Sequence, residues 1–231
     1  MIRREGNQVR VSTVSLIILV TGVLSLPYGC ARAAVPDPVQ REELIRLAEQ
    51  PEIKIVYYPP VALEVYRTKD SSSAAARGPI DRVVEGSRLR NRFALEDPAL
   101  QVKERIVLLL AFEFGFKNIT SVLHVRLADD IHTLKMDFKN SALIDFRTLV
   151  WALGSLPAPH SYSGLLYSAR ARLIRLNPSR VVWEGQCLVQ RKDLSLEQLE
   201  SRDAAPLKET LAEIADACAS QLAIQLRGKA K

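Results

Sequence analysis

The stretch YSARARLIRLNPSRVVWEGQCLV, residues 167–189, decides the fold because it has the pattern of two strands joined by a turn. The first strand places three small or apolar residues on one face: Ala169, Ala171 and Leu173. The returning strand has its better core face at Trp183, Gly185, Cys187 and Val189. For the two apolar faces to lie on the same side, the connection must hold an odd number of residues or a β-bulge. The stretch therefore predicts an antiparallel hairpin with one irregularity.

A third strand is expected before this hairpin, over residues 143–151. Its alternation predicts one face made of Ile144, Phe146, Thr148 and Val150, and an opposite face made of Asp145, Arg147, Leu149 and Trp151. Shorter strands are expected at residues 53–58, 61–66 and 118–127, and Pro59-Pro60 separates the first two because proline cannot donate to a sheet. Residues 128–140 fit either a strand or a loop with one helical turn.

Helices are expected at residues 42–50, 97–114 and 206–226. Asp97 can cap the second of them, Pro98 suits its first position and Gly115 can end it. Residues 106–112 are apolar on every side, which predicts that the sheet covers one side of this helix and another segment covers the other. The predicted fold class is α+β, a mainly antiparallel (mixed) sheet of about 4–6 strands with helices, including the C-terminal one, packed on one face.

The last helix carries a single apolar stripe: Leu207, Leu211, Ile214, Cys218 and Leu222. The stripe directs Cys218 towards the sheet, and the strand alternation places Cys187 on the face that receives the helix. The two patterns are independent and both predict that these cysteines meet. A disulfide between them is the preferred interpretation, and two separate buried thiols are the alternative.

The N-terminus has the layout of a secretory signal, in which Arg3, Arg4 and Arg10 accompany an apolar run. The run over residues 11–26 would be roughly 24 Å long as a helix, less than the about 30 Å of a membrane core. Ala31-Arg32-Ala33 fits a cleavage site of the Ala-x-Ala kind, and Cys30 after Gly29 is an alternative lipidation site, although Pro27 stands where a lipobox has leucine. We expect a signal peptide over residues 1–33.

The remaining 198 residues suit a single α+β periplasmic domain, residues 34–231, with a mobile loop near residues 69–80, where the sequence is rich in serine and alanine. Removal of the signal peptide leaves a net charge of +3, too small to indicate nucleic-acid binding. Contact with a membrane is expected only through a lipid on Cys30. The domain is expected to lie in the periplasm after cleavage near Ala33, or to be lipid-anchored at Cys30.

Motifs that carry catalysis or hold cofactors are missing from the sequence, which has no glycine-rich phosphate loop, His-Glu-x-x-His pair or Cys-x-x-Cys pair. We therefore expect no catalytic residue, no metal site and no cofactor. The three histidines are His124, His132 and His160. Asp129-Asp130 near His132 is expected to be a solvated turn, and a small periplasmic hydrolase that uses His160 or His132 is the alternative function.

One sheet face is the candidate for binding an envelope protein partner, because arginine and aromatic residues are enriched at protein interfaces. The residues predicted to form this partner face are Arg147, Leu149, Trp151, Arg170 and Arg172. A solvated face with cross-strand ion pairs is the alternative.

The order of the segments 143–151, 167–174, Trp183-x-Gly-x-Cys187 and the Cys218 helix resembles a group of uncharacterised proteobacterial envelope proteins, over residues 140–227. The hairpin RLIRLNPSRVVWEGQC is more loosely similar to that of periplasmic α/β lipoproteins of the curli-secretion and TolB amino-terminal type. The resemblance implies a non-enzymatic assembly or transport accessory, and it supplies no catalytic residue. The poor lipobox departs from the lipoprotein members.

Overall fold

The structure is a computed structural model that describes residues 41–67, 78–125, 128–139, 141–155 and 163–228. The chain divides into two compact units, Met1–Val35 and Pro36–Lys231, and every described residue lies in the second. The elements are α1 (Arg41–Ala48), β1 (Ile53–Tyr57), β2 (Glu64–Tyr66), α2 (Pro79–Phe93), α3 (Ala99–Phe114), β3 (Ile119–Val125), α4 (Ile131–Phe138), β4 (Ala142–Ser155), β5 (Ser163–Leu176), β6 (Ser179–Lys192) and α5 (Leu196–Gly228). The predicted signal peptide and residues 68–77 of the predicted loop lie outside the described residues, while Pro79 and Ile80 begin α2.

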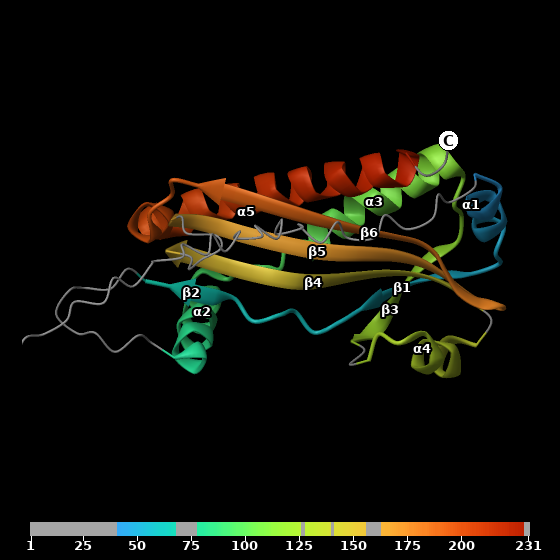
Figure 1. Cartoon of the computed structure of the whole chain (residues 1–231), viewed down its shortest axis with the longest axis horizontal. Helices are drawn as coiled ribbons and strands as arrows, with labels where there is room; N and C mark the ends of the chain where they lie inside the picture. The colour runs from blue at the N-terminus through green and yellow to red at the C-terminus, as the bar shows by residue number, and fades with distance from the viewer. Residues whose placement is uncertain (1–40, 68–77, 126–127, 140, 156–162, 229–231) are drawn as a thin grey trace, which may run out of the picture. The chain divides into compact units, whose positions relative to one another are not determined.

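The strands form one six-stranded mixed sheet in the order β3-β1-β4-β5-β6, with β2 also paired to β4 (Figure 1). The long pairings of β4 with β5 and of β5 with β6 are antiparallel, whereas β1 and β2 run parallel to β4. The C-terminal helix packs on this sheet. The predicted α+β class with a mixed sheet is therefore confirmed.

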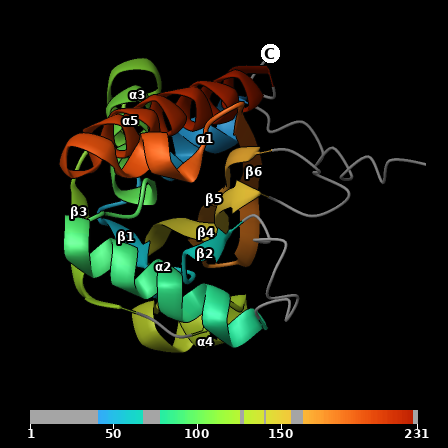
Figure 2. The same cartoon turned by 90° about the vertical axis from the view of Figure 1, so that its left-hand side faces the viewer.

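Helices α3 and α5 lie side by side over one face of the sheet, and α4 lies on the opposite side (Figures 1 and 2). Residues of α1, α2, α3 and α5 contribute to one main core with the strands. Leu134 and Phe138 of α4 belong to a separate apolar cluster with Val56, Leu143 and Ile174. The prediction that helices pack on one face is therefore wrong for α4, which covers the side chains that the alternation of β4 turns away from the main core.

The β5–β6 hairpin has the irregularity that the sequence predicts. Ala169 pairs with Cys187, and Leu173 pairs with Trp183, but the next pair is Ile174 with Val181. Val182 is therefore an extra residue in β6, which is a β-bulge. The bulge brings the apolar residues of both strands to the same face, where Cys187 and Trp183 are buried.

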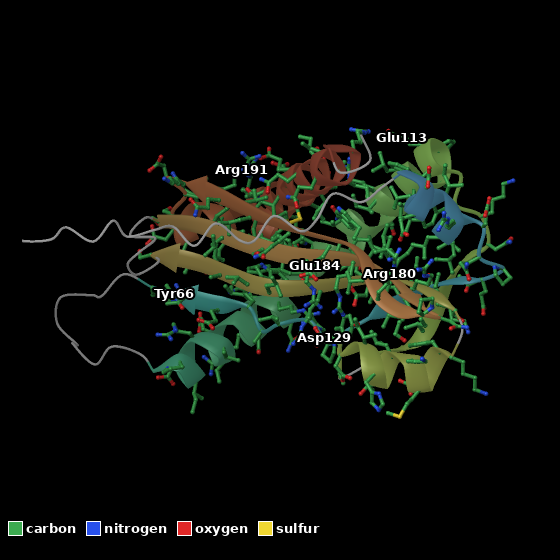
Figure 3. The ribbon with its side chains drawn as sticks, turned by 45° about the vertical axis from the view of Figure 1, so that its right-hand side comes forward. Tyr66, Glu113, Asp129, Arg180, Glu184 and Arg191 are labelled. Atoms are coloured by element: carbon green, nitrogen blue, oxygen red, sulfur yellow. A yellow bond between two sulfur atoms is a disulfide. The ribbon has the colours of Figure 1, made fainter. Side chains whose placement is uncertain are left out.

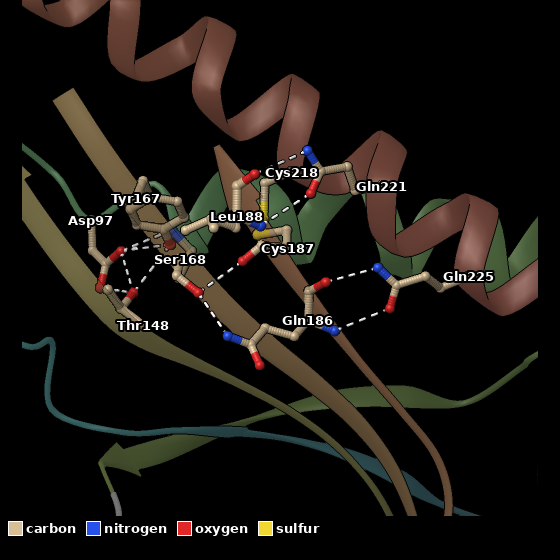
Figure 4. Close-up of a disulfide and its surroundings, with 11 residues drawn as sticks. Asp97, Thr148, Tyr167, Ser168, Gln186, Cys187, Leu188, Cys218, Gln221 and Gln225 are labelled. Carbon is tan, nitrogen blue, oxygen red and sulfur yellow. Dashed lines mark hydrogen bonds between the residues drawn. A yellow bond between two sulfur atoms is a disulfide. The ribbon is translucent and has the colours of Figure 1, made fainter. Parts of the chain in front are cut away.

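A disulfide joins Cys187 of β6 to Cys218 of α5, with 5.1 Å between their Cα atoms (Figure 4). Both cysteines are fully buried, as are the residues of the predicted helical stripe. Helix α5 leaves the helical conformation at residues 201–204 and continues from there to Gly228. The predicted meeting of the two cysteines is confirmed.

Two glutamines on α5 also bind the outer edge of β6 (Figure 4). The side-chain amide of Gln221 accepts from the Leu188 amide at 3.0 Å and donates to the Leu188 carbonyl at 3.2 Å. Gln225 makes the same pair of bonds with Gln186, at 3.2 and 2.7 Å. Gln221 and Gln225 are four residues apart on the helix, about 6 Å along its axis, and this matches the spacing of about 6.6 Å between Leu188 and Gln186 along the strand. We call this pair of contacts the glutamine clamps.

Two helices depart from the expectations. The outer side of α3 is not covered: Leu108 is 55% exposed and Phe112 is 84% exposed, because α5 packs beside α3 rather than over it. Helix α2 has no counterpart among the predicted elements. It turns Leu89 and Phe93 towards the main core.

Gly86 allows α2 to lie directly on the chain before β2, and we expect Gly86→Ala to lower the free energy of unfolding by about 1–3 kcal/mol. A Cβ at this position would overlap the carbonyl oxygen of Leu63, which belongs to the backbone and cannot rotate away. Urea denaturation of the variant measures the loss. Ser87→Ala, at the exposed neighbour on the same helix, is the control. A Gly86→Ala variant within about 0.5 kcal/mol of wild type would contradict this close packing.

Candidate functional site

The strand pairing along one edge of β4 is interrupted, and a pocket lies beside the interruption. Pairing with β1 ends at Phe146, and pairing with β2 begins at Ala152. Between β1 and β2 the chain contains Pro59-Pro60, which have no amide hydrogen to give to the sheet. The pocket has a volume of about 270 Å³ and is lined from three separate stretches, within residues 57–60, 90–100 and 146–148.

Asp97 lines this pocket although it is only 9% exposed. Its Oδ1 accepts from the Ala99 amide at 2.9 Å, from the Thr148 hydroxyl at 2.7 Å and from the Tyr167 hydroxyl at 3.2 Å. Its Oδ2 also accepts from Thr148, at 2.7 Å. Figure 4 shows Asp97, Thr148 and Tyr167 together. All three donors are neutral, and no lysine or arginine in the described part of the chain forms an ion pair with Asp97.

The Tyr167 hydroxyl is a fixed donor within this group. Burial, and after it the negative charge of Asp97, raises the pKa of Tyr167 above its ordinary value. The phenol therefore keeps its proton at neutral pH and can donate to Asp97 or to Thr148, whose hydroxyl lies 3.1 Å away. Asp97 thus has two tasks, because it also bonds the first amide of α3 as the sequence predicts for a cap.

The walls of the pocket are largely apolar and aromatic. Tyr57 and Phe146 contribute rings, and Leu95 contributes an aliphatic side chain. The Tyr57 hydroxyl accepts a hydrogen bond from Nζ of Lys103 at 2.8 Å. Apolar walls with a few polar groups are typical of sites that bind a small molecule or a side chain of a partner.

The predicted partner face is on the opposite side of the sheet, and the structure corrects its membership. β4 pairs Thr148 with Ala169 and then Val150 with Ser168, so Leu149 is an extra residue. This β-bulge reverses the alternation beyond it. Trp151 consequently lies in the main core, 1% exposed, and its placement on the partner face is wrong.

Arg172 lies on that face beside Asp129, but it is buried and so is not available to a partner. It is 6% exposed, and its Nε lies 3.1 and 3.0 Å from the two carboxylate oxygens of the fully buried Asp145. The hydroxyl of Tyr58 also donates to Asp145, at 2.7 Å. Arg172 and Asp145 form a buried ion pair, whereas Arg147, Leu149 and Arg170 keep partial exposure. Binding of a partner by these three residues stays a prediction.

The expectation that Asp129 lies in a solvated turn is wrong. Asp129 binds this face of the sheet close to α4 (Figure 3). Its Oδ2 accepts from Arg147 and from Arg170, both at 2.6 Å, and its backbone carbonyl accepts from Arg172 at 2.7 Å. Arg147 and Arg170 stand directly opposite each other in β4 and β5, where two like charges repel. Asp129 relieves that repulsion, and Asp130 caps α4 by accepting from the Thr133 amide.

The stabilisation by Asp129 is expected to disappear in acid. Burial alone would raise the pKa of Asp129, but hydrogen bonds from Arg170 and Arg147, together with their charges, lower it to about 2. Because the unfolded value is about 3.9, the stabilisation is complete above that pH and is lost as the pH falls through 2. Urea denaturation of wild type and of Asp129→Asn at pH 7, 5, 3 and 2 should show their difference in unfolding free energy shrinking towards pH 2. A difference that stays constant would contradict the assignment.

Of the three histidines, only His132 has a described side chain. His132 is exposed in the first turn of α4 and does not line the pocket. His160 and Cys30 lie outside the described residues, and His124 is in β3. Within the ranges that the structure describes, no group of three or more His, Cys, Asp or Glu side chains is placed to hold a metal ion.

Sequence reasoning missed the pocket, although it noted two of its parts. Pro59-Pro60 predicts a break between strands and Asp97 predicts a helix cap, but neither pattern shows that the break and the cap meet. Thr148 was a usable signal, because it shares the core face of its strand with Ile144 and Phe146. A hydroxyl among large apolar residues requires a hydrogen-bond partner.

No family model matches the chain, and no curated protein matches it. Three of the similar solved structures are bacterial proteins. PelC from Paraburkholderia phytofirmans, solved as a dodecamer, is 9% identical over 84% of this chain and 92% of that one, with a TM-score of 0.32. Lipoprotein GNA1162 from Neisseria meningitidis is 13% identical over 72% and 99%, with a TM-score of 0.28. Rare lipoprotein B from Shewanella oneidensis is 12% identical over 73% and 92%, with a TM-score of 0.27.

At these identities and TM-scores the likeness assigns this chain neither a family nor a function. Among the described helices, none combines the length and the apolar character that crossing a membrane would require.

Proposed function

We propose that this chain is an exported, non-enzymatic binding protein of the cell envelope, an accessory for transport or assembly that holds a group of its ligand or partner in the pocket beside β4. The pocket carries the proposal. It combines apolar walls with one buried carboxylate, that of Asp97, which hydrogen bonds from Ala99, Thr148 and Tyr167 hold in place. This is the usual arrangement of a recognition site.

Two features support export. The N-terminal arginines and apolar run have the layout of a secretory signal. The disulfide between Cys187 and Cys218 suits an oxidising compartment such as the periplasm. The mature domain would be released near Ala33 or anchored by a lipid on Cys30. The sequence of the hairpin, RLIRLNPSRVVWEGQC, loosely resembles that of curli-secretion and TolB amino-terminal proteins, and this resemblance implies the accessory role that we propose.

Intact mass of the mature protein tests export directly. We expect a chain that begins at Ala34, or at an acylated Cys30, and that gains two hydrogen atoms when a reductant is added. A chain that keeps residues 1–29 or shows no gain would contradict the proposed compartment.

A photo-crosslinking residue at position 100 tests the binding role in the producing cell. Leu100 lines the pocket and is 39% exposed, whereas Leu108, on the same helix and outside the pocket, is the matched position. We expect one defined adduct at position 100 and none at 108. Ala99→Phe should suppress the adduct because Ala99 lines the pocket, and Ala111→Phe, at an exposed site of the same helix, should not. Equal labelling at both positions would contradict the proposal.

The hydrolase alternative is tested by His132→Ala and His160→Ala. We expect both variants to keep the adduct at position 100 and the cellular phenotype of the wild type. If they abolish the phenotype while the fold and the adduct survive, the non-enzymatic proposal fails.

A further inference from the structure

We infer that the pocket beside β4 binds a positively charged ammonium group carried on an apolar body. This inference rests on the proposed function, because it names the chemical class that the same pocket would take. The group could belong to a free amine or to a lysine side chain of a protein partner.

The carboxylate of Asp97 has room for one more donor. Thr148 has one hydroxyl hydrogen, which lies within reach of both oxygens; Oδ1 also accepts from Ala99 and Tyr167, whereas Oδ2 has no other donor among the described residues. A carboxylate oxygen offers about two acceptor sites, and a buried charge is unfavourable unless it is paired. Since the donors to Asp97 are all neutral, an ammonium group at Oδ2 would supply the missing positive charge.

The other charges of the pocket agree with a cationic ligand. Glu96 also lines the pocket, so its acidic residues outnumber its one basic residue, Arg90. The Nε of Arg90 donates to the Leu95 carbonyl at 3.3 Å, and its guanidinium lies 5.9 Å from the centre of the Trp151 ring. Arg90 therefore already has partners of its own, and an anionic ligand would enter a lining that contains two acidic residues, Glu96 and Asp97.

The walls suit the body of such a ligand. The rings of Tyr57 and Phe146 line the pocket, and aromatic faces attract ammonium groups by cation–π interaction. The volume of about 270 Å³ lies just below the range of roughly 300–1,000 Å³ found for drug-sized ligands. The pocket therefore fits one aromatic ring or one short aliphatic chain with its charged end.

Three probes that share a phenylethyl body and differ in the charge of their end group test the inference on the mature chain by calorimetric titration: 2-phenylethylammonium, 2-phenylethanol and 3-phenylpropanoate. We expect the ammonium probe to bind at least about tenfold more tightly than the alcohol, and the carboxylate not to bind. Asp97→Asn should remove that advantage, with its fold checked by circular dichroism. Ala99→Phe should abolish binding of the ammonium probe although it leaves Asp97 in place. Ala111→Phe should leave binding of the ammonium probe unchanged.

The outcomes separate this inference from the proposed function. If the alcohol binds as tightly as the ammonium and Ala99→Phe abolishes both, the pocket binds ligands but the inferred charge preference is wrong. If no probe binding responds to Ala99→Phe, both the inference and the pocket-based function fail. Nα-acetyl-lysine amide against Nα-acetyl-norleucine amide distinguishes the sources: tenfold preference for lysine supports a protein side chain, and no preference limits the inference to free amines.

Discussion

Replacing Cys187 and Cys218 together with serine is expected to lower the free energy of unfolding by about 3–4 kcal/mol. The bond joins residues 31 positions apart, and a cross-link of that length restricts the unfolded chain. Both positions are fully buried, so the serine hydroxyls gain no access to water in the folded state. Urea denaturation of the mature wild type and of the double variant measures the loss.

Wild-type protein unfolded in excess reductant is the control; it should lose no more than the double variant, because it keeps two apolar thiols where the variant buries hydroxyls. Gln221→Ala removes one glutamine clamp but keeps the disulfide, and we expect it to cost only about 1 kcal/mol. A double variant within about 1 kcal/mol of wild type would show that the clamps and the apolar stripe alone hold α5 on the sheet.

Arg172→Met should destabilise the protein by about 3–5 kcal/mol, because it leaves a buried charge without its partner. Asp145 is fully buried and keeps only the hydroxyl of Tyr58 among the side-chain donors described above. Methionine retains most of the apolar stem of arginine, so the loss reports mainly on the charge. Chemical denaturation at neutral pH gives the change in unfolding free energy.

A matched set of variants shows whether charge or packing is responsible. The double variant Asp145→Leu with Arg172→Met removes both charges and should recover most of the loss. Arg147→Met breaks a more exposed ion pair with Asp129 and should cost no more than about 1 kcal/mol. If the double variant is as unstable as Arg172→Met alone, the lost packing of the arginine stem explains the effect instead.

The features that the sequence predicts well are those that depend on neighbouring residues. The alternation of β5 and β6 fixes which face carries Cys187, and the stripe of α5 fixes the direction of Cys218. The alternation of β5 and β6 also requires an irregularity, either an odd number of residues in the connection or a bulge, and the bulge at Val182 is the form that the structure has. These predictions needed no knowledge of the distant parts of the chain.

The features that escaped prediction arise where distant segments meet. The bulge at Leu149 cannot be located from the pattern of β4, because residues 149–153 are all apolar and no longer mark a face; extending the earlier alternation to Trp151 therefore placed the tryptophan on the wrong face. Helix α2 has a weak apolar pattern, and Gly86 within it lowers helix propensity. The pocket joins three segments, within residues 57–60, 90–100 and 146–148, that together span about ninety positions of the chain, and proximity of that kind cannot be read from one sequence.

The glutamine clamps have a consequence for self-association. A side-chain amide copies the donor and acceptor of a peptide unit, so Gln221 and Gln225 present to Leu188 and Gln186 what a neighbouring strand would present. A strand of another molecule could pair with this part of the β6 edge only by displacing α5, which the disulfide holds there. We therefore expect the glutamine clamps to prevent edge-to-edge association at this part of β6, where other sheets use a charged residue or a proline.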